Sequence, residues 1–585
     1  MLSFYLGLLG AALTAFLPYP LDEASDVEAA RALFERNLQA IRDQDRGAYL
    51  ACYLESERLV RVGPEGQEHG YVDFAAGLGD TWPDRLASRD LELTWLGPGL
   101  VFGTYRYHVV YGGESTHGIS ERLFQHTDDG WRIALTTAHP QPKGVAAPPL
   151  ALVGGTALDG TGGVIEDAVV LIRDARIEAI GPLEATSIPV EYEVIDTSGH
   201  FLVPGMVDTH VHYSQTGWAD GRPDAYDVRD RFPYTEAMSQ LEAHPERFHR
   251  AFLAHGVTAA LDCGGYPWTR AMAQATHADP HSPHVLAAGP LLASWVPSML
   301  HVPDQSQFVL MTNERDVRAT VASHAAYGSD VIKVWLVLVD RSLDELEPLI
   351  HAAGEAAREH NLPLIVHATQ LEAARLAVDA GAQLLVHSIE DTVVDDAFIE
   401  ACQESGVFYC PTLTVSRGYH RYTDGRLPDE LLASLENVSP WIAERVRATP
   451  TGRPSHAPTA ALRESARALQ LHIMSQNLQR LANAGIPVVL GTDAGNPLTL
   501  HGASVAEELQ AMQNAGLTPD QVLTAATSDA ARALGLLDTG RLTPGSKADL
   551  LVLDQDPRED IAQLGKPTWI LRHGVLHARQ DLLTH

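Results

Sequence analysis

Hydrophobic and polar positions repeat with two different periods along the first 140 residues of the chain. From Asp26 to Ile41 the apolar residues recur every three or four positions, which predicts an amphipathic helix. Alternation of period two follows, and Asp128-Asp129-Gly130 predicts a hairpin turn between the last two of four strands, expected at 91–96, 100–111, 118–126 and 131–137. A helix ahead of a long antiparallel sheet predicts an α+β domain.

A stretch rich in proline and glycine, from Gln141 to Pro149, separates this domain from the rest of the chain. Short apolar runs separated by glycine-rich turns follow this stretch, and the same pattern occurs again near the C-terminus. These runs predict strands at 150–153, 168–173, 176–180, 549–553, 568–572 and 575–578. We expect segments from both ends to combine in one small β-sandwich.

Between these flanking segments, apolar runs of strand length alternate with helical patterns, which is typical of a parallel sheet. Two of the helices are expected to start at capping boxes, Ser342-Leu343-Asp344-Glu345 and Thr518-Pro519-Asp520-Gln521. Eight strands are predicted, at 206–211, 258–262, 285–288, 331–335, 364–366, 384–386, 407–409 and 488–490. The predicted fold class is α/β, a (β/α)₈ TIM barrel with a long helical insertion at 412–480.

The charge of the chain excludes one class of partner. A formal net charge of −33 over 585 residues would repel the phosphate backbone of a nucleic acid. A disulfide framework or a zinc ribbon is not expected, because no CxxC pair occurs among Cys52, Cys263, Cys402 and Cys410. The remaining partners that we expect are a small-molecule substrate and, in a homo-oligomer, further copies of the chain.

An apolar run from Leu2 to Leu17 is too short for stable membrane insertion and has the length of a signal-peptide core. We favour export over a cytoplasmic location on this ground, although no Lys or Arg precedes the run. An uncleaved apolar tail and a misassigned start are the alternatives. The expected domains are a signal peptide at 1–20, the α+β domain at 21–143, the β-sandwich from 148–203 and 541–580, and the barrel at 204–540.

Chemistry-bearing side chains fall at the ends of predicted barrel strands. In a barrel of this kind the active site lies at the carboxyl ends of the strands. Period two places two imidazoles of the first strand on one face, where both can bind the same cation. About one pair of histidines spaced two positions apart is expected by chance among 27 histidines, so this pair alone is weak evidence. The prediction of a metal site rests on six side chains that all fall at ends of predicted strands: His210, His212, Lys333, His367, His387 and Asp493.

These motifs resemble those of the amidohydrolase superfamily, and within it the imidazolonepropionase-like and prolidase-like group. The resemblance covers about residues 150 to 580. It rests on Val203-Pro204-Gly205-Met206-Val207-Asp208-Thr209-His210-Val211-His212, Val331-Ile332-Lys333-Val334, Val366-His367-Ala368, Val386-His387-Ser388, Gly491-Thr492-Asp493-Ala494-Gly495, Ala525-Ala526-Thr527 and the closing segment 540–550.

The resemblance implies two divalent metal ions, with zinc expected. His210, His212 and Asp493 would hold one ion, and His367 and His387 the other. Lys333 would bridge them as a carbamate (a carbamylated lysine), because a free ammonium beside two dications would be repelled. Asp493 would act as general base and then as general acid in hydrolysis.

The substrate contacts are less sharply indicated. His301 stands where relatives carry a Gly-Gly-His, and Tyr213 follows the histidine pair. Arg417 and Tyr419 follow the seventh strand and could bind a carboxylate. The alternatives are that His301 is an ordinary loop histidine, that Tyr213 packs in the core, and that Arg417 lies in a solvent-exposed loop.

We expect hydrolysis of a C–N amide bond, linear or cyclic, as in a dipeptide or an N-acyl amino acid. Lactone, carboxyl-ester or organophosphate hydrolysis on the same site is the alternative chemistry. A catalytically inactive binding or scaffold protein is the alternative class. In that case the N-terminal domain, which resembles the SnoaL-like (nuclear-transport-factor-like) cone over about residues 22 to 140, would carry the function.

Overall fold

The computed structural model describes residues 23–63, 66–78, 81–83, 85–111, 114–140, 149–424, 440–448 and 460–583. The expected signal peptide at 1–20 therefore lies outside the described residues. The chain divides into two compact units, residues 1–146 and 147–585. Among the described residues, no helix combines the length and the apolar character that a membrane-spanning segment needs.

The first unit has the predicted α+β organisation. Helix α2 (Glu23–Arg42) places Leu33, Phe34 and Leu38 against Val101 and Phe124 of the sheet. The other helices are α3 (Arg46–Leu50) and α4 (Tyr71–Gly77). The sheet runs β2-β1-β6-β5-β4-β3, with β7 beside β5; these strands are β1 (Val60–Gly63), β2 (Gly66–His69), β3 (Arg85–Gly97), β4 (Leu100–Tyr111), β5 (Glu114–Thr127), β6 (Gly130–Thr137) and β7 (His139–Pro140). The resemblance to a SnoaL-like cone stays a prediction.

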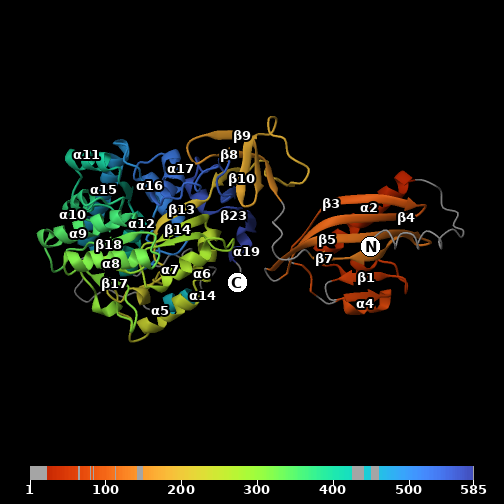
Figure 1. Ribbon diagram of the computed structural model, residues 1–585, viewed down its shortest axis with the longest axis horizontal. Helices are drawn as coiled ribbons and strands as arrows, with labels where there is room; N and C mark the ends of the chain where they lie inside the picture. Colours follow the sequence, from red (N-terminus) through yellow and green to blue (C-terminus); the bar gives the residue numbers. More distant parts are fainter. Residues whose placement is uncertain are drawn as a thin grey trace. The chain divides into compact units, whose positions relative to one another are not determined.

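Segments from both ends of the second unit combine, as predicted, but the pairings join them in one eight-stranded sheet. Figure 1 shows β8, β9 and β10 beside β23. Strand β8 connects the parts, because its first half pairs with β11 and its second half with β12, which in turn pairs with β22. The strands are β8 (Leu150–Leu158), β9 (Val164–Arg173), β10 (Arg176–Pro182), β11 (Glu193–Asp196), β12 (Phe201–Pro204), β22 (Leu550–Leu553), β23 (Trp569–Arg572) and β24 (Val575–Ala578).

Parallel strands make up the centre of the second unit. They are β13 (Met206–Val211), β14 (Val257–Asp262), β15 (His284–Ala287), β16 (Leu291–Ala293), β17 (Phe308–Leu310), β18 (Ile332–Trp335), β19 (Leu364–His367), β20 (Leu384–Val386) and β21 (Phe408–Cys410). The first seven predicted strand positions coincide with β13, β14, β15, β18, β19, β20 and β21.

The eighth predicted position joins the last strand to the first. Val489 N donates to Tyr409 O (3.0 Å) in β21, and Thr209 N in β13 donates to Leu490 O (2.9 Å). Asp330 N donates to Ala287 O (3.0 Å), which links the two groups of parallel strands. The parallel pairing therefore returns to its starting strand, as a barrel requires.

Helices alternate with these strands (Figure 1). Both predicted capping boxes are present, Ser342 with Glu345 at the start of α9 and Thr518 with Gln521 at the start of α17. The helices are α5 (Tyr234–Ala243), α6 (Glu246–Ala254), α7 (Trp268–Thr276), α8 (Glu314–Ala326), α9 (Leu343–Glu359), α10 (Leu371–Asp379), α11 (Asp396–Ser405), α12 (Leu413–Asp424), α14 (Pro440–Ala448), α15 (Ala460–Asn483), α16 (Val505–Asn514), α17 (Pro519–Ala526), α18 (Ser528–Ala533) and α19 (Arg579–Leu583). Helices α12, α14 and α15 occupy the predicted insertion ahead of the eighth strand position.

Candidate active site

The six side chains predicted as metal ligands line a single cavity of about 270 Å³. His210, Lys333 and His367 lie within parallel strands, and His212, His387 and Asp493 lie in the residues that follow such strand positions. Four of them are buried, with His210 1%, Lys333 2% and Asp493 5% exposed, whereas His367 and His387 are partly exposed. The structure therefore brings together side chains that are far apart in the sequence, since His210 and Asp493 are separated by 283 positions.

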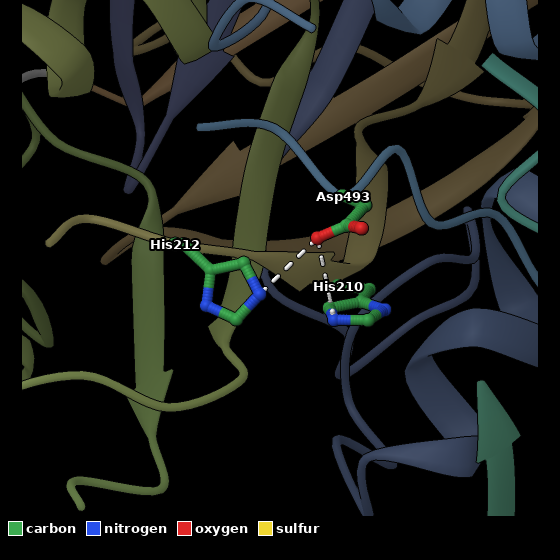
Figure 2. A group of neighbouring side chains, drawn as sticks. All are labelled: His210, His212 and Asp493. Atoms are coloured by element: carbon green, nitrogen blue, oxygen red, sulfur yellow. Dashed lines mark ion pairs between the residues drawn. The ribbon is translucent and has the colours of Figure 1, made fainter. Parts of the chain in front are cut away.

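His210, His212 and Asp493 form the tightest group in this cavity. Figure 2 shows the Asp493 carboxylate between the two imidazoles. Asp493 Oδ1 lies 3.1 Å from His212 Nε2 and 3.6 Å from His210 Nε2. One donor atom from each residue lies within 4.8 Å of the other two, which is the spacing of atoms that can share one cation.

His367 and His387 lie directly beside this group. The rings of His367 and His387 have centroids 4.4 Å apart, and those of His387 and His210 are 4.8 Å apart. His387 Nδ1 is 3.9 Å from Asp493 Oδ2, so the Asp493 carboxylate faces both pairs of imidazoles.

Hydrogen bonds orient two of the imidazoles. His212 Nδ1 lies 2.8 Å from Gly264 O, which only accepts, so Nδ1 carries the proton and Nε2 offers its lone pair toward Asp493. His387 Nδ1 lies 2.8 Å from Thr412 Oγ1. An imidazole held in this way is preorganised as a metal ligand.

The electrostatics of the site favour neutral imidazoles. Burial lowers the pKa of His210 well below its ordinary value, and the neighbouring Lys333 lowers it further. Burial, with Lys333 second, lowers the pKa of His367 to about 3. The pKa of His387 is likewise depressed by burial and by His367. Neutral imidazoles retain the lone pair that a metal ligand needs.

Lys333 is a buried amine without a carboxylate partner among the residues that the structure describes. Its Nζ lies 3.2 Å from Cys263 Sγ. Burial raises the pKa of the Cys263 thiol to about 11, so the thiol is neutral at ordinary pH and does not balance an ammonium charge. A lysine in this setting is unusual, because a buried ammonium ordinarily pairs with an anion.

Two further aspartates hold the ligand-bearing segments in place. Asp208 accepts hydrogen bonds from Thr492 N (3.0 Å) and Thr492 Oγ1 (2.6 Å), directly before Asp493. Asp262 accepts one from Tyr213 N (2.8 Å), directly after His212. Burial raises the pKa of Asp208 to about 7. The sequence analysis assigned neither a role; their signal was an acidic residue inside an apolar strand.

Backbone conformation also marks the site. His387 and Asp493 adopt φ of 79° and 59°, and Thr412, which contacts His387, adopts 44°. Non-glycine residues rarely occupy this left-handed region, and such strain clusters at functional sites. Two of the six candidate ligands, His387 and Asp493, are therefore held in the site by a backbone conformation that is locally unfavourable.

The rest of the cavity is lined by both apolar and polar side chains. Its apolar walls include Leu291, Leu300, Phe308, Trp335 and Met474. Its polar groups include Gln307, Glu390 and the Arg222–Tyr419–Asn496 cluster. In that cluster Tyr419 OH donates to Asn496 Oδ1 (2.8 Å), and Arg222 also donates to this oxygen. Of these polar residues only Tyr419 was singled out from the sequence, since the others stand in loops without a motif.

Three expected substrate contacts do not line the cavity. The His301 side chain is exposed, and its neighbour Leu300 faces the cavity instead. Tyr213 is fully buried, and its hydroxyl lies 3.0 Å from His249 Nδ1. Arg417 pairs with Glu507 (3.6 Å). Helical periodicity explains the last result, because α12 presents Val415, Ser416 and Tyr419 to the cavity and turns position 417 away.

The residues present fit a divalent cation. Asp493 Oδ1 is buried and accepts no hydrogen bond among the described residues, although two imidazole nitrogens lie nearby. Imidazole nitrogens with a carboxylate oxygen are the donors that zinc binds in catalytic sites. A cation would satisfy the unpartnered oxygen and the imidazole lone pairs together.

Comparison with known proteins agrees with this geometry. Residues 201–573 match the amidohydrolase family. The imidazolonepropionase of Deinococcus deserti is 26% identical over 425 residues, covering 68% of this chain and 88% of that enzyme. The ochratoxinase of Aspergillus niger is 25% identical over 470 residues, covering 71% of this chain and 83% of that protein. A solved Xaa-Pro dipeptidase with bound methionine in the active site shares the fold, with a TM-score of 0.54 and 21% identity over 74% of this chain and 100% of that one.

Proposed function

Because the chain belongs to the amidohydrolase family, we propose that it cleaves amide bonds of small molecules at a binuclear metal centre inside a (β/α)₈ barrel. It is a hydrolase that acts on carbon–nitrogen bonds. One observation carries the proposal: four imidazoles, one carboxylate and one buried amine line the same cavity.

His210, His212 and Asp493 would hold one ion, and His367 and His387 the second. The first assignment rests on donor atoms that lie within 4.8 Å of one another. The second rests on the adjacency of the His367 and His387 rings. Zinc suits this donor set, because imidazole and carboxylate are among its ordinary ligands.

Lys333 would bridge the ions as a carbamate. In this modification the neutral Nζ amine attacks carbon dioxide, an N–C bond forms, and one proton leaves to solvent. The product is an anion with two oxygens in place of a cation. The proposal is supported by the burial of Lys333, whose hydrogen-bond partner among the described residues is a neutral thiol.

When bound, the divalent ions supply Lewis acidity, which lowers the pKa of a water molecule and polarises the substrate carbonyl. Asp493 would accept a proton from that water at its carboxylate as the water oxygen attacks the carbonyl carbon. It would then deliver the proton to the leaving nitrogen as the C–N bond breaks. Its position between the two imidazole pairs supports this role.

Metal analysis and turnover of designed variants test the proposal. We expect about two ions per chain in the purified protein, and loss of bound metal in His210→Ala. The matched control is His244→Ala, because the His244 imidazole is 50% exposed and lies outside the cavity. In Asp493→Asn we expect kcat to fall by about 100- to 10,000-fold.

A panel of amides, lactones, carboxyl esters and organophosphates distinguishes the chemistries. Hydrolysis of amides above the other classes supports the proposal. Full metal content with undiminished turnover in Asp493→Asn would rule out the proton transfer. A protein that binds no metal would instead be a scaffold.

A further inference from the structure

Glu390 is a carboxylate on the cavity wall that the proposed mechanism does not use. It lies three residues after His387, in the loop that follows β20. Its backbone N–H donates to Thr369 O (3.0 Å), which ties this loop to the one that follows β19. Gln470 of α15 donates from Nε2 to Glu390 Oε2 (2.5 Å). The carboxylate is therefore held at a defined place on the wall.

No cation pairs with this carboxylate among the residues that the structure describes. Its hydrogen-bond partner Gln470 is a neutral amide. Burial raises the pKa of Glu390, the Gln470 hydrogen bond partly offsets this rise, and the nearby Asp391 adds a further negative charge. A partly buried carboxylate in such a place gains free energy when a cation approaches it.

Apart from Lys333, whose charge the proposed carbamate would remove, the other charged groups of the cavity have close partners. Arg222 donates to both oxygens of Asp224, at 2.9 Å and 2.8 Å, so its charge is balanced within the protein. Asp493 faces the imidazoles. Among the described lining residues outside the proposed metal centre, Glu390 is thus the charged group that lacks an opposite charge.

We propose that Glu390 binds a protonated amine of the substrate, so that the preferred substrates are small amides that carry a cationic amino group. This inference rests on the proposed amide hydrolysis and narrows its substrate class. The apolar walls would accept the uncharged part of such a molecule, and a cavity of about 270 Å³ limits it to a small one. The ammonium can sit on the acyl part of the amide or on the amine part.

Three amides distinguish these two positions of the ammonium group in the substrate. Glycyl-L-norleucine carries the ammonium on its acyl part, N-acetyl-L-lysine carries it on its amine part, and N-acetyl-L-norleucine lacks it. We expect the wild-type protein to cleave at least one cationic amide with a kcat/KM about ten- to a hundredfold above that of N-acetyl-L-norleucine, the range of a hydrogen bond to a charged group. Preference for N-acetyl-L-norleucine, or no preference, would overturn the proposal.

The variant Glu390→Gln removes the charge but keeps an oxygen that can accept the Gln470 hydrogen bond. We expect the preference for the cationic amide to disappear, while kcat/KM for N-acetyl-L-norleucine stays within about twofold. The matched control is Glu372→Gln, because the Glu372 side chain is 70% exposed and lies outside the cavity. An equal loss on all three amides would show a structural role and contradict the proposal.

Calorimetric binding of the same amides separates this inference from the proposed function. If no amide is cleaved, tighter binding of a cationic amide that Glu390→Gln abolishes supports the Glu390 site while the hydrolysis proposal fails. If amides are cleaved without charge preference, the hydrolysis proposal stands and the Glu390 site fails. Absence of binding by either cationic amide also overturns the Glu390 site.

Discussion

At the scale of the residue, the site depends on side chains whose charge the fold leaves unbalanced. Lys333 is the clearest case, because its amine is buried beside neutral imidazoles and a neutral thiol. An ammonium would be costly there, and a carbamate would turn the same side chain into an anionic ligand. The proposed carbamate would remove this unfavourable charge.

The variant Lys333→Gln tests this account. We expect bound metal and kcat both to fall, because the glutamine amide offers no anionic oxygen. Reconstitution of the metal-free wild-type protein in buffer without carbon dioxide or bicarbonate should also lower metal uptake, and added bicarbonate should restore it. Metal content and turnover measure both effects.

The control for this test is Lys547→Gln, since Lys547 pairs with Asp538 away from the cavity. That variant should retain the metal content and turnover of the wild-type protein. Full metal uptake by the wild-type protein in buffer without carbon dioxide would contradict a carbamate.

At the scale of the element, the junction after the eighth strand position shows how closely the barrel interior is packed. Gly491 lies between this strand and Asp493. A Cβ built on Gly491 would lie 2.2 Å from Cys410 Sγ and 3.0 Å from His210 Cβ. The glycine is required here because no space remains between two neighbouring strands and a proposed metal ligand.

We expect Gly491→Ala to lower the free energy of unfolding by about 1–3 kcal/mol, the usual cost of overpacking a core. Metal affinity should fall as well, because the new methyl group presses on His210. Denaturant unfolding and metal titration measure the two effects.

A Cys410→Ala background should restore part of the stability, since it removes the shorter contact and leaves the one with His210. The double variant is compared with Cys410→Ala alone. Wild-type stability in Gly491→Ala, or no gain in the double variant, would show that the junction relaxes without cost.

At the scale of the whole molecule, the proposed metal centre would connect segments that span most of the second unit. The proposed ligands come from β13 near its start and from the eighth strand position near its end. A ligand that binds only the folded state stabilises that state by mass action. Metal removal should therefore act on the second unit as a whole rather than on one loop.

We expect a chelator to lower the thermal unfolding midpoint of the wild-type protein. A free ion at a thousand times its dissociation constant stabilises the folded state by about 4 kcal/mol, so the shift should be several degrees. Differential scanning calorimetry with and without chelator measures it. The double variant His210→Ala, His212→Ala should unfold at the lower temperature and show little response to chelator. An unchanged midpoint in the wild-type protein would mean that no ion contributes to its stability.

Much of the fold could be predicted because local patterns are strong in this chain. Parallel strands are buried on both faces and read as continuous apolar runs, so seven of the eight predicted positions coincide with assigned strands and the eighth is hydrogen-bonded to β21 and β13. Helix starts such as Ser342 and Thr518 follow from capping chemistry alone. The joining of all flanking strands in one sheet was not predictable, because it depends on which partners the two halves of β8 meet.

The candidate ligands could be predicted and the substrate contacts could not. His210 and Lys333 lie within strands, and Asp493 comes three residues after the eighth strand position, so their placement in the sheet follows once the strands are known. His301, Tyr213 and Arg417 stand in loops or on a helix, where orientation depends on packing. None of the three lines the cavity: His301 is exposed, Tyr213 is buried beside His249, and Arg417 pairs with Glu507.

The sequence by itself determined the order of strands and helices and the residue types that stand at the strand ends, because both follow from local periodicity. Only the tertiary structure decided which loop side chains reach the cavity and which charges remain without a partner. That Arg222 is balanced by Asp224 while Glu390 has only a neutral amide beside it depends on contacts between distant segments. Such contacts are properties of the packed molecule, since no local pattern encodes the charge that a side chain will meet.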